Sequence, residues 1–263
     1  MKKLFTLLLF AVLSSYCAMA WDNRGHSTIA YIAERHLTPR AKANIESYIG
    51  GRSIVYYAAW MDFNRSTPPF DVTRDWHVDY WTDAHRTDEN GNPQPPCSVS
   101  QIKRIVSEMG DFRTLSDSLV NVNIKFLVHL VGDMHCPVHT KYSVNEPNLK
   151  QRSVKMKGKK MGFHAFWDAS VGYYNKGLKC DQIAEKYDTL CDAEIAAICE
   201  GNANDWAAVN AVEMREIYTL LPMHSEVTEV SEQNHARMKE ITMQQALRGG
   251  YRLAKVLNEI FSK

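Results

Sequence analysis

The stretch Phe126-Leu-Val-His129-Leu-Val-Gly-Asp133-Met-His-Cys-Pro137-Val-His139 combines the pattern of a buried helix with residues that bind metals. His129 and Asp133 are four residues apart, so a helix places both side chains on one face. The apolar residues around them are typical of a helix in a protein core. Pro137 ends the helix, and His139 follows just beyond it. The stretch therefore predicts a core helix over residues 121–135 that carries an imidazole and a carboxylate.

A second imidazole–carboxylate pair has the same spacing, at His164 and Asp168. One such histidine alone is more often a hydrogen-bonded core residue than a metal ligand, but two copies in one chain favour a metal site. Further candidate ligands lie upstream, at Trp21, His26, Asp62 and His77. Imidazole and carboxylate together suit zinc in hydrolytic sites, whereas calcium and magnesium prefer oxygen donors. No cysteine pair has the spacing of a cysteine-ligated zinc site, so cysteine carries little weight here.

The rest of the chain also has mainly helical patterns. Thr38 and Pro39 provide a cap and a first-turn proline, and Gly50-Gly51 closes that helix. Apolar periodicity predicts further helices over 24–37, 99–117, 121–135, 164–174, 204–220 and 229–261, whereas strand-like alternation is nearly absent. Long loops are expected at 64–75, 82–96 and 140–163. We expect an all-α fold, a single mainly helical domain over residues 21–263 with long loops at its active site.

Residues 1–20 have the three-part plan of a secretory signal peptide: two lysines, an apolar run, and small residues that end at Ala20. Trp21 then becomes the mature N-terminus. No later segment reaches the roughly 20 apolar residues that a spanning helix requires. We expect an exported, soluble protein without a membrane anchor, in the bacterial periplasm or the extracellular medium.

Removing the two leader lysines from the 31 basic residues leaves 29 against 30 acidic residues, a formal balance of −1. The mature protein therefore lacks a bulk positive field for a polyanion, and any attraction for phosphate must be local. Five of the six cysteines lie after residue 20. Because exported proteins usually pair their cysteines, two disulfides and one free thiol are expected.

In these motifs the chain resembles the zinc-dependent nucleases of the S1/P1 type, which are similar in fold to bacterial zinc phospholipase C. The resemblance spans nearly all of the mature chain. Carried over position by position, it implies three zinc ions held by nine residues: Trp21, His26, Asp62, His77, His129, Asp133, His139, His164 and Asp168. Asp133 would bridge two of the ions, and the freed amino group of Trp21 would bind one. The resemblance also implies catalytic roles for Asp62, Asp133 and Arg65, with Arg65 neutralising charge on the phosphate.

The activity implied is hydrolysis of phosphodiester bonds in single-stranded DNA and RNA, and of 3′-nucleotides, by a monomeric endonuclease and 3′-nucleotidase whose products carry 5′-phosphates. A phospholipase C on the same scaffold is the nearest alternative. The five-residue step from Trp21 to His26, the final ligand Asp168 and the presence of Arg65 favour the nuclease. A non-catalytic zinc-binding protein is a weaker alternative, because closed structural sites do not need so many carboxylates.

The resemblance is thinner around the residues that would contact a nucleic-acid strand. The segment between His139 and His164 carries seven basic residues against one glutamate, and Lys157, Lys159 and Lys160 are its most closely spaced group. Such a segment could follow the phosphates of a strand, or it could be an ordinary solvated loop. Tyr80, three residues after His77, is the candidate for stacking on a base.

Overall fold

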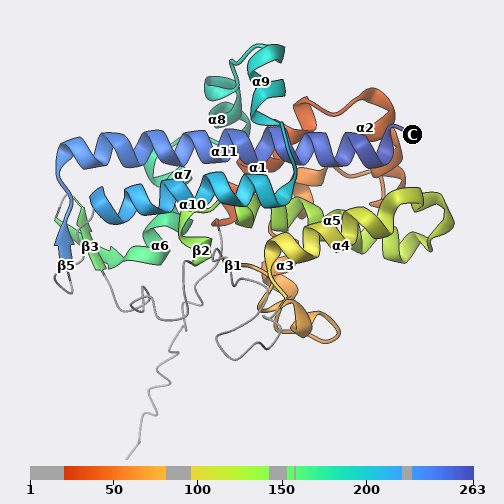
Figure 1. The fold of residues 1–263 in the computed structure, drawn as a ribbon, viewed down its shortest axis with the longest axis horizontal. Coiled ribbons are helices and arrows are strands. Elements are labelled where there is room, and N and C mark those ends of the chain that lie inside the picture. The colour runs from red at the N-terminus through yellow and green to blue at the C-terminus, as the bar shows by residue number, and fades with distance from the viewer. Residues whose placement is uncertain (1–20, 81–95, 142–152, 157, 221–226) are drawn as a thin grey trace, which may run out of the picture.

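The computed structural model describes residues 21–80, 96–141, 153–156, 158–220 and 227–263. The expected signal peptide and the expected loop 82–96 lie outside the described residues, apart from Pro96. The described chain is mainly helical, with helices running along the length of the molecule and a small sheet at one end (Figure 1). The prediction of a mainly helical fold is confirmed.

Helix α5 spans Asp117–Met134 and lies in the core of the molecule. Its N-cap residue is Ser116, whose hydroxyl accepts a hydrogen bond from the backbone N–H of Leu119, which satisfies one of the free donors of the first turn. The residues Val120, Ile124, Leu127 and Val131 recur at helical spacing and are at most 1% exposed. This apolar face fixes the rotation of the helix, and so the direction of His129 and Asp133.

Helices α1, Asn23–Arg35, and α11, Glu232–Phe261, are the most extensively packed pair of elements. A Cβ atom added to Gly250 on α11 would lie 2.4 Å from the Ile32 side chain and 3.1 Å from the backbone oxygen of Ile29. The absence of a side chain at Gly250 therefore allows the two backbones to approach closely. The longest helix of the chain thereby supports the helix that carries His26.

The remaining elements surround these three helices. They are α2 (Pro39–Tyr48), η1 (Ile54–Tyr57), α3 (Trp60–Asn64), η2 (Phe70–Thr73), α4 (Ser98–Glu108), η3 (Met109–Thr114), η4 (Pro137–His139), α6 (Phe163–Asp168), α7 (Ser170–Tyr174), α8 (Cys180–Tyr187), α9 (Asp192–Ile198) and α10 (Ala203–Leu220). Helix α10 lies beside α11 in Figure 1. Two apolar clusters enclose the end of α5, one containing Leu127 and Val128, the other Trp21 and Val138.

The structure differs from the sequence prediction in how several helices are divided. The expected helix 99–117 ends as α4 at Glu108, and the backbone of Asp111 is non-helical at φ −128° and ψ 80°. The expected helix 164–174 consists of α6 and α7, which meet at Ala169. Helices α8 and α9 were not predicted, because eight-residue and seven-residue helices hold too few turns for clear periodicity.

Part of the expected loop 140–163 forms strands. Strand β3, Ser153–Met156, pairs antiparallel with β4, Lys159–Gly162, and parallel with β5, Val227–Glu229. Gly158 adopts φ +80° between β3 and β4, a conformation that glycine reaches without strain. Val154 and Met156 are buried whereas Lys155 is exposed. This alternation covers only three residues, and lysines follow it, so the sequence does not predict a strand here.

A second, two-stranded sheet lies next to the candidate ligands. Strand β1, Asp79–Tyr80, pairs parallel with β2, Thr140–Lys141, with Asp79 opposite Thr140. Each strand directly follows a segment that carries a candidate histidine, His77 before β1 and His139 before β2. The pairing therefore brings together two histidines that are far apart in the sequence.

The expected disulfides are not found, since all five cysteines of the described chain are free thiols. Cys191 and Cys199 cap opposite ends of α9, which places them roughly 12 Å apart along the helix axis, beyond the reach of a disulfide. Cys97 caps α4, Cys180 begins α8, and Cys136 is buried after α5. Among the described helices, none combines the length and apolar character that crossing a bilayer requires.

Candidate metal centre

The centre of the site is Asp133, in the last turn of α5. The side chain of Asp133 is fully buried, as is that of His129 one turn earlier. The His129 Nε2 atom lies 3.3 Å from Asp133 Oδ2. The four-residue spacing on α5 therefore presents an imidazole and a carboxylate side by side, as the sequence predicts.

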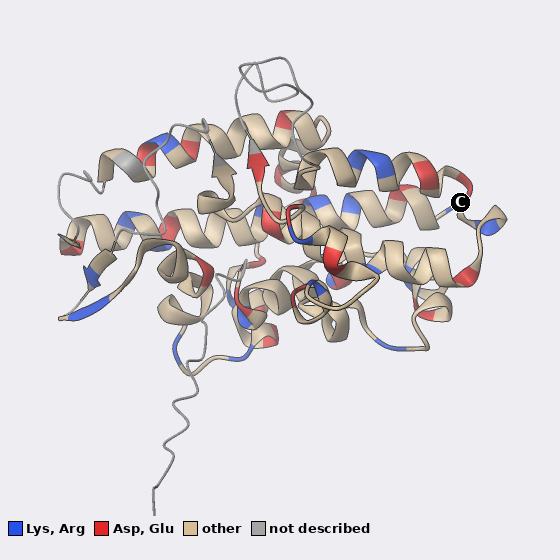
Figure 2. Cartoon of the chain, turned by 90° about the horizontal axis from the view of Figure 1, so that it is seen from below, with Lys and Arg blue, Asp and Glu red and all other residues tan. Residues whose placement is uncertain are grey.

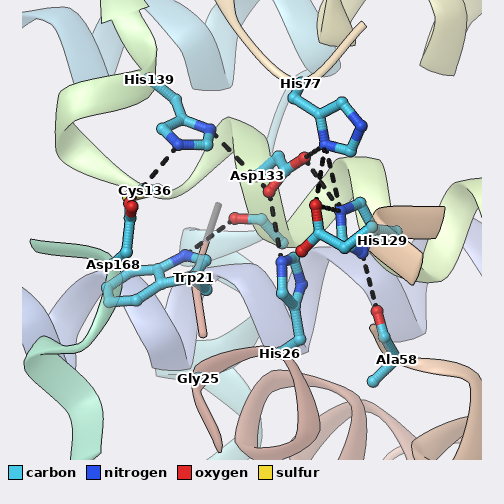
Figure 3. A network of polar contacts seen from close by, with 12 residues as sticks. Trp21, Gly25, His26, Ala58, His77, His129, Asp133, Cys136, His139 and Asp168 are labelled. Atoms are coloured by element: carbon cyan, nitrogen blue, oxygen red, sulfur yellow. Dashed lines mark hydrogen bonds and ion pairs between the residues drawn. The ribbon is translucent and has the colours of Figure 1, made fainter. Parts of the chain in front are cut away.

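Two further imidazoles reach Asp133 from other elements (Figure 3). The His77 Nδ1 atom lies 2.8 Å from Asp133 Oδ2, and His26 Nε2, on α1, lies 3.3 Å from Oδ1. Burial alone would raise the pKa of Asp133, but the surrounding histidines hold it well below its ordinary value. Asp133 is therefore a carboxylate whose two oxygens face nitrogens on opposite sides.

Asp62, on α3, completes a first group with His77 and His129. Its Oδ1 atom lies 3.8 Å from both His77 Nδ1 and His129 Nε2. The other ring nitrogen of His129, Nδ1, lies 2.8 Å from the backbone oxygen of Ala58. If Nδ1–H donates to this oxygen, the lone pair of Nε2 points toward the carboxylates and is free to bind a cation.

A second group forms around Asp168, at the end of α6. The Asp168 Oδ1 atom lies 3.5 Å from His164 Nε2 and 3.7 Å from His139 Nε2. The other nitrogen of His139, Nδ1, lies 3.8 Å from Asp133 Oδ1. His139 therefore lies between the two carboxylates and links this group to the first.

Trp21 is packed against both groups. Its side chain is fully buried, and its indole N–H donates to the backbone oxygen of Gly132 at 2.9 Å. The backbone N–H of Asp22 donates to the backbone oxygen of Asp168 at 2.8 Å. The Asp22 side chain also caps α1 through the backbone N–H of Gly25. These contacts hold the Trp21 backbone between α5, α6 and α1.

The buried donor atoms of this cluster fit a metal centre. Buried polar atoms normally have a hydrogen-bond partner, yet several in this cluster have none among the described residues. They are His26 Nδ1 and Nε2, Asp62 Oδ1 and Oδ2, His77 Nε2, Asp133 Oδ1, and His139 Nδ1 and Nε2. The possible ligand atoms form three groups, and within each group the atoms lie no more than 4.8 Å apart. The groups are His26, His129 and Asp133; Asp62, His77 and His129; and Cys136, His139 and Asp168.

The pKa values in the cluster show how strongly burial acts on it. Burial lowers the pKa of His139 to about 3. For Asp168, burial and then the nearby carboxylates of Asp133 and Asp62 raise the pKa well above its ordinary value. Bound cations would favour neutral His139 and ionised Asp168. They would therefore compensate the cost of burying a charged carboxylate at Asp168, and they would bind the neutral imidazole that burial already favours at His139.

Gly132 determines how closely α1 approaches α5. A Cβ atom at this position would lie 2.8 Å from His26 Nδ1 and 3.2 Å from His26 Cε1. Only glycine leaves room for this imidazole beside Asp133. Neither Gly132 nor Ala58 carries a ligand side chain, so the motifs in the sequence do not point to either residue. A glycine inside an otherwise apolar helix was the one signal that could have pointed to this position.

The other candidate residues have different outcomes. Arg65, the C-cap residue of α3, is 8% exposed, and its Nη1 atom lies 3.4 Å from Asp62 Oδ1. Tyr80 lies in β1, but its side chain is outside the described part of the structure, and Lys157 is outside the described residues altogether. Lys159 and Lys160 lie on β4, and both are exposed. The structure thus brings Arg65 to the cluster and places the two lysines on the small sheet.

The sequence is similar to that of known nucleases over most of its length. The family model for S1/P1 Nuclease matches residues 21–262. Nuclease S1 of Aspergillus oryzae is 25% identical over 195 residues, which cover 66% of this chain and 62% of that protein. Nuclease P1 of Penicillium citrinum is 27% identical over 157 residues, covering 56% of this chain and 57% of that protein. Endonuclease 4 of Arabidopsis thaliana is 24% identical over 274 aligned positions, which cover 93% of this chain and 90% of that protein. The match therefore spans less than two thirds of the two fungal nucleases.

Replacing Gly132 by alanine is expected to weaken zinc binding by roughly 10–100-fold, the range typical of changes to residues that orient metal ligands. The added methyl group would push the His26 ring away from Asp133. Since alanine favours a helix by about 1 kcal/mol over glycine, reduced helix formation cannot produce this weakening. Zinc content after dialysis against a competing chelator measures it.

Gly110→Ala is the matched control, because a Cβ atom at Gly110 meets nothing within 4 Å. If both variants retain zinc as the unaltered protein does, the proposed close packing of His26 on α5 is not needed for metal binding.

Proposed function

This chain belongs to the S1/P1 nuclease family, and we propose that it is an exported zinc-dependent endonuclease and 3′-nucleotidase acting on single-stranded DNA and RNA. The observation that supports this most directly is the buried cluster of imidazoles and carboxylates around Asp133. Bound zinc lowers the pKa of a coordinated water molecule and stabilises charge on phosphoryl oxygens. The products are proposed to carry 5′-phosphates.

We propose three zinc positions. The first uses Asp62, His77, His129 and Asp133; the second uses His26, Asp133 and the amino group and carbonyl of Trp21; the third uses His139, His164 and Asp168. The distances around Asp133 and Asp168 support these assignments. Three zinc ions bring six positive charges and the three aspartates return three negative ones. The excess would attract phosphate locally in a mature chain whose formal charge is near zero.

Two carboxylates, Asp133 and Asp62, would position the groups that act on the substrate. Asp133 positions its neighbouring histidines by facing them with both oxygens. Asp62 holds Arg65, whose guanidinium would approach the phosphoryl oxygens as negative charge develops there. A planar, permanently charged group with several donors suits this task. Because Arg65 is mostly buried, its charge is screened less by water than that of a surface arginine.

The amino group of Trp21 would be free to act as a ligand only after removal of residues 1–20. An α-amino group has a reference pKa of about 7.7–8.0, low enough for a metal to displace its proton near neutral pH. The burial of the Trp21 side chain and the hydrogen bond between Asp22 and Asp168 support a fixed position for this terminus. Export and signal removal would then be steps in assembling the active protein.

Lys159 and Lys160 are proposed to contact a bound strand away from the metal cluster. They border a cavity of about 840 Å³ together with Lys176, Lys239, Tyr173 and His235. The rings of Tyr173 and His235 are stacked, with centroids 5.8 Å apart. Basic and aromatic groups together suit phosphates and bases of single strands. Figure 2 shows basic residues on the strands at this end. Two acidic residues are also present there: Glu229 on β5, which pairs with Lys155, and Glu232, which borders the same cavity.

The first test is a substrate panel. The chain starting at Trp21 is incubated with single-stranded DNA, RNA, a 3′-nucleotide and phosphatidylcholine, with and without a zinc chelator. We expect cleavage of the nucleic acids and the nucleotide, loss of activity with chelator, and recovery on adding zinc. Hydrolysis of phosphatidylcholine alone would identify a phospholipase C. Retention of zinc with no substrate cleaved would indicate a zinc-binding protein.

The second test concerns the N-terminus. A form with one additional residue before Trp21 is expected to bind one zinc ion fewer, because its amino group is displaced from the cluster, and to lose most of its activity. Metal analysis by mass spectrometry measures the zinc content. The control adds the same residue after Lys263, so the chain is lengthened equally while the Trp21 amino group stays free. Equal zinc content and activity in both forms would contradict a role for the Trp21 amino group.

The third test reverses charge at Lys159 and Lys160 with glutamate. Binding of long single strands should weaken, and the slope of log affinity against log salt should fall by roughly 0.7 for each phosphate that the protein no longer neutralises. Hydrolysis of a 3′-mononucleotide should change little. Arg40→Glu with Lys42→Glu is the matched control, because both residues are exposed on α2, at the opposite end of the molecule from β3 (Figure 1). Equal effects on polymer and mononucleotide would exclude a role in binding the strand.

A further inference from the structure

Cys136 lies between two candidate ligands in the segment that links α5 to η4. Its backbone N–H donates to the backbone oxygen of Asp133 at 2.9 Å, and its own oxygen accepts from the backbone N–H of His139 at 2.9 Å. These two hydrogen bonds form a tight turn. Cys136 is fully buried, so its side chain is held inside the protein beside the cluster.

The sulfur atom of Cys136 is the third donor around one oxygen of Asp168. Asp168 Oδ1 lies 3.5 Å from His164 Nε2, 3.7 Å from His139 Nε2 and 3.9 Å from Cys136 Sγ. In tetrahedral zinc sites, bond lengths near 2.0 Å for nitrogen and oxygen and 2.3 Å for sulfur place neighbouring donors roughly 3.3–3.5 Å apart. The three distances to Asp168 Oδ1 are within about half an ångström of this donor spacing.

A hydrogen bond from the thiol to Asp168 explains this placement less well. Thiols are weak donors, and 3.9 Å is long for such a contact. Both ring nitrogens of His139, which is 2% exposed, have no hydrogen-bond partner among the described residues. Cys136, His139 and Asp168 also bring their ligand atoms within 4.8 Å of one another. Two independent features of the cluster thus point to a cation next to the sulfur.

We propose that Cys136 is the fourth protein ligand of the metal position formed by His139, His164 and Asp168. The inference rests on the proposed function, in that it assigns a further ligand to the same zinc cluster. On binding, the S–H bond breaks, the proton leaves to solvent, and the sulfur keeps the electron pair that forms the bond to zinc. No electron is transferred to or from the protein.

Two consequences follow for the chemistry of the cluster. The thiolate adds a negative charge, so the excess positive charge of three zinc ions and their ligands falls by one. A site with four protein ligands is closed, like structural zinc sites, whereas catalytic sites keep an open position. This position would bind phosphate only by expanding its coordination, as would the first position, to which Asp62, His77, His129 and Asp133 also give four protein ligands.

Cobalt substitution tests the proposal, because a thiolate bound to Co²⁺ gives an intense charge-transfer band in the near ultraviolet that imidazole and carboxylate do not give. The chain from Trp21 has five cysteines. A variant with Cys97, Cys180, Cys191 and Cys199 changed to serine keeps only Cys136, and it should retain the band after cobalt loading. This variant leaves the buried cysteine untouched, so the test does not depend on folding without it.

Cys136→Ser should lose the band and bind its third metal ion at least about tenfold more weakly, since a direct ligand matters at least as much as the residues that orient one. Cys191→Ser, at an exposed cysteine, is the matched control and should behave as the unaltered protein does. Three bound metal ions and nuclease activity without a thiolate band would overturn the Cys136 assignment and leave the proposed function standing. If the unaltered protein binds no metal ion, both the Cys136 assignment and the proposed zinc-dependent function are overturned.

Discussion

The structure depends on the burial of one carboxylate, Asp133, among imidazoles. Moving an ionised carboxylate out of water costs several kcal/mol unless opposite charge or hydrogen bonds compensate. Asp133 is fully buried, and its oxygens face His77 and His129 on one side and His26 on the other. The imidazoles compensate part of this penalty, whereas shared cations would satisfy all of these groups. The surrounding elements are arranged so that their donors converge on this position.

The scaffold achieves this convergence with several local devices. The apolar face of α5 fixes the rotation of the helix. The pairing of β1 with β2 brings together the segments that carry His77 and His139, and Gly132 leaves room for the His26 ring. The Ala58 carbonyl, bonded to the far nitrogen of His129, orients that ring. Each device positions a donor without being a donor side chain, so removing any one would disturb the cluster while every ligand residue stayed in the sequence.

The sequence predicts the donor side chains better than their supports. Helix α5 and the pairs at His129 and His164 follow from four-residue spacing, and the mainly helical fold follows from periodicity. The break at Ala169, the short helices α8 and α9 and the β3–β4 hairpin were missed, because tertiary packing decides short elements. The two expected disulfides were inferred from the tendency of exported proteins to pair their cysteines. The free thiols show that cysteine count alone does not fix pairing.

The packing of α1 against α11 has a consequence for the order in which the chain can mature. His26 is near the beginning of the sequence, yet the helix that supports it occupies residues 232–261, close to the end. A ribosome therefore synthesises almost the whole polypeptide before α1 can pack against Gly250 of α11. Without α11, a nascent or truncated chain would leave α1, and with it His26, without this support, so we expect the cluster to assemble only after α11 has been synthesised.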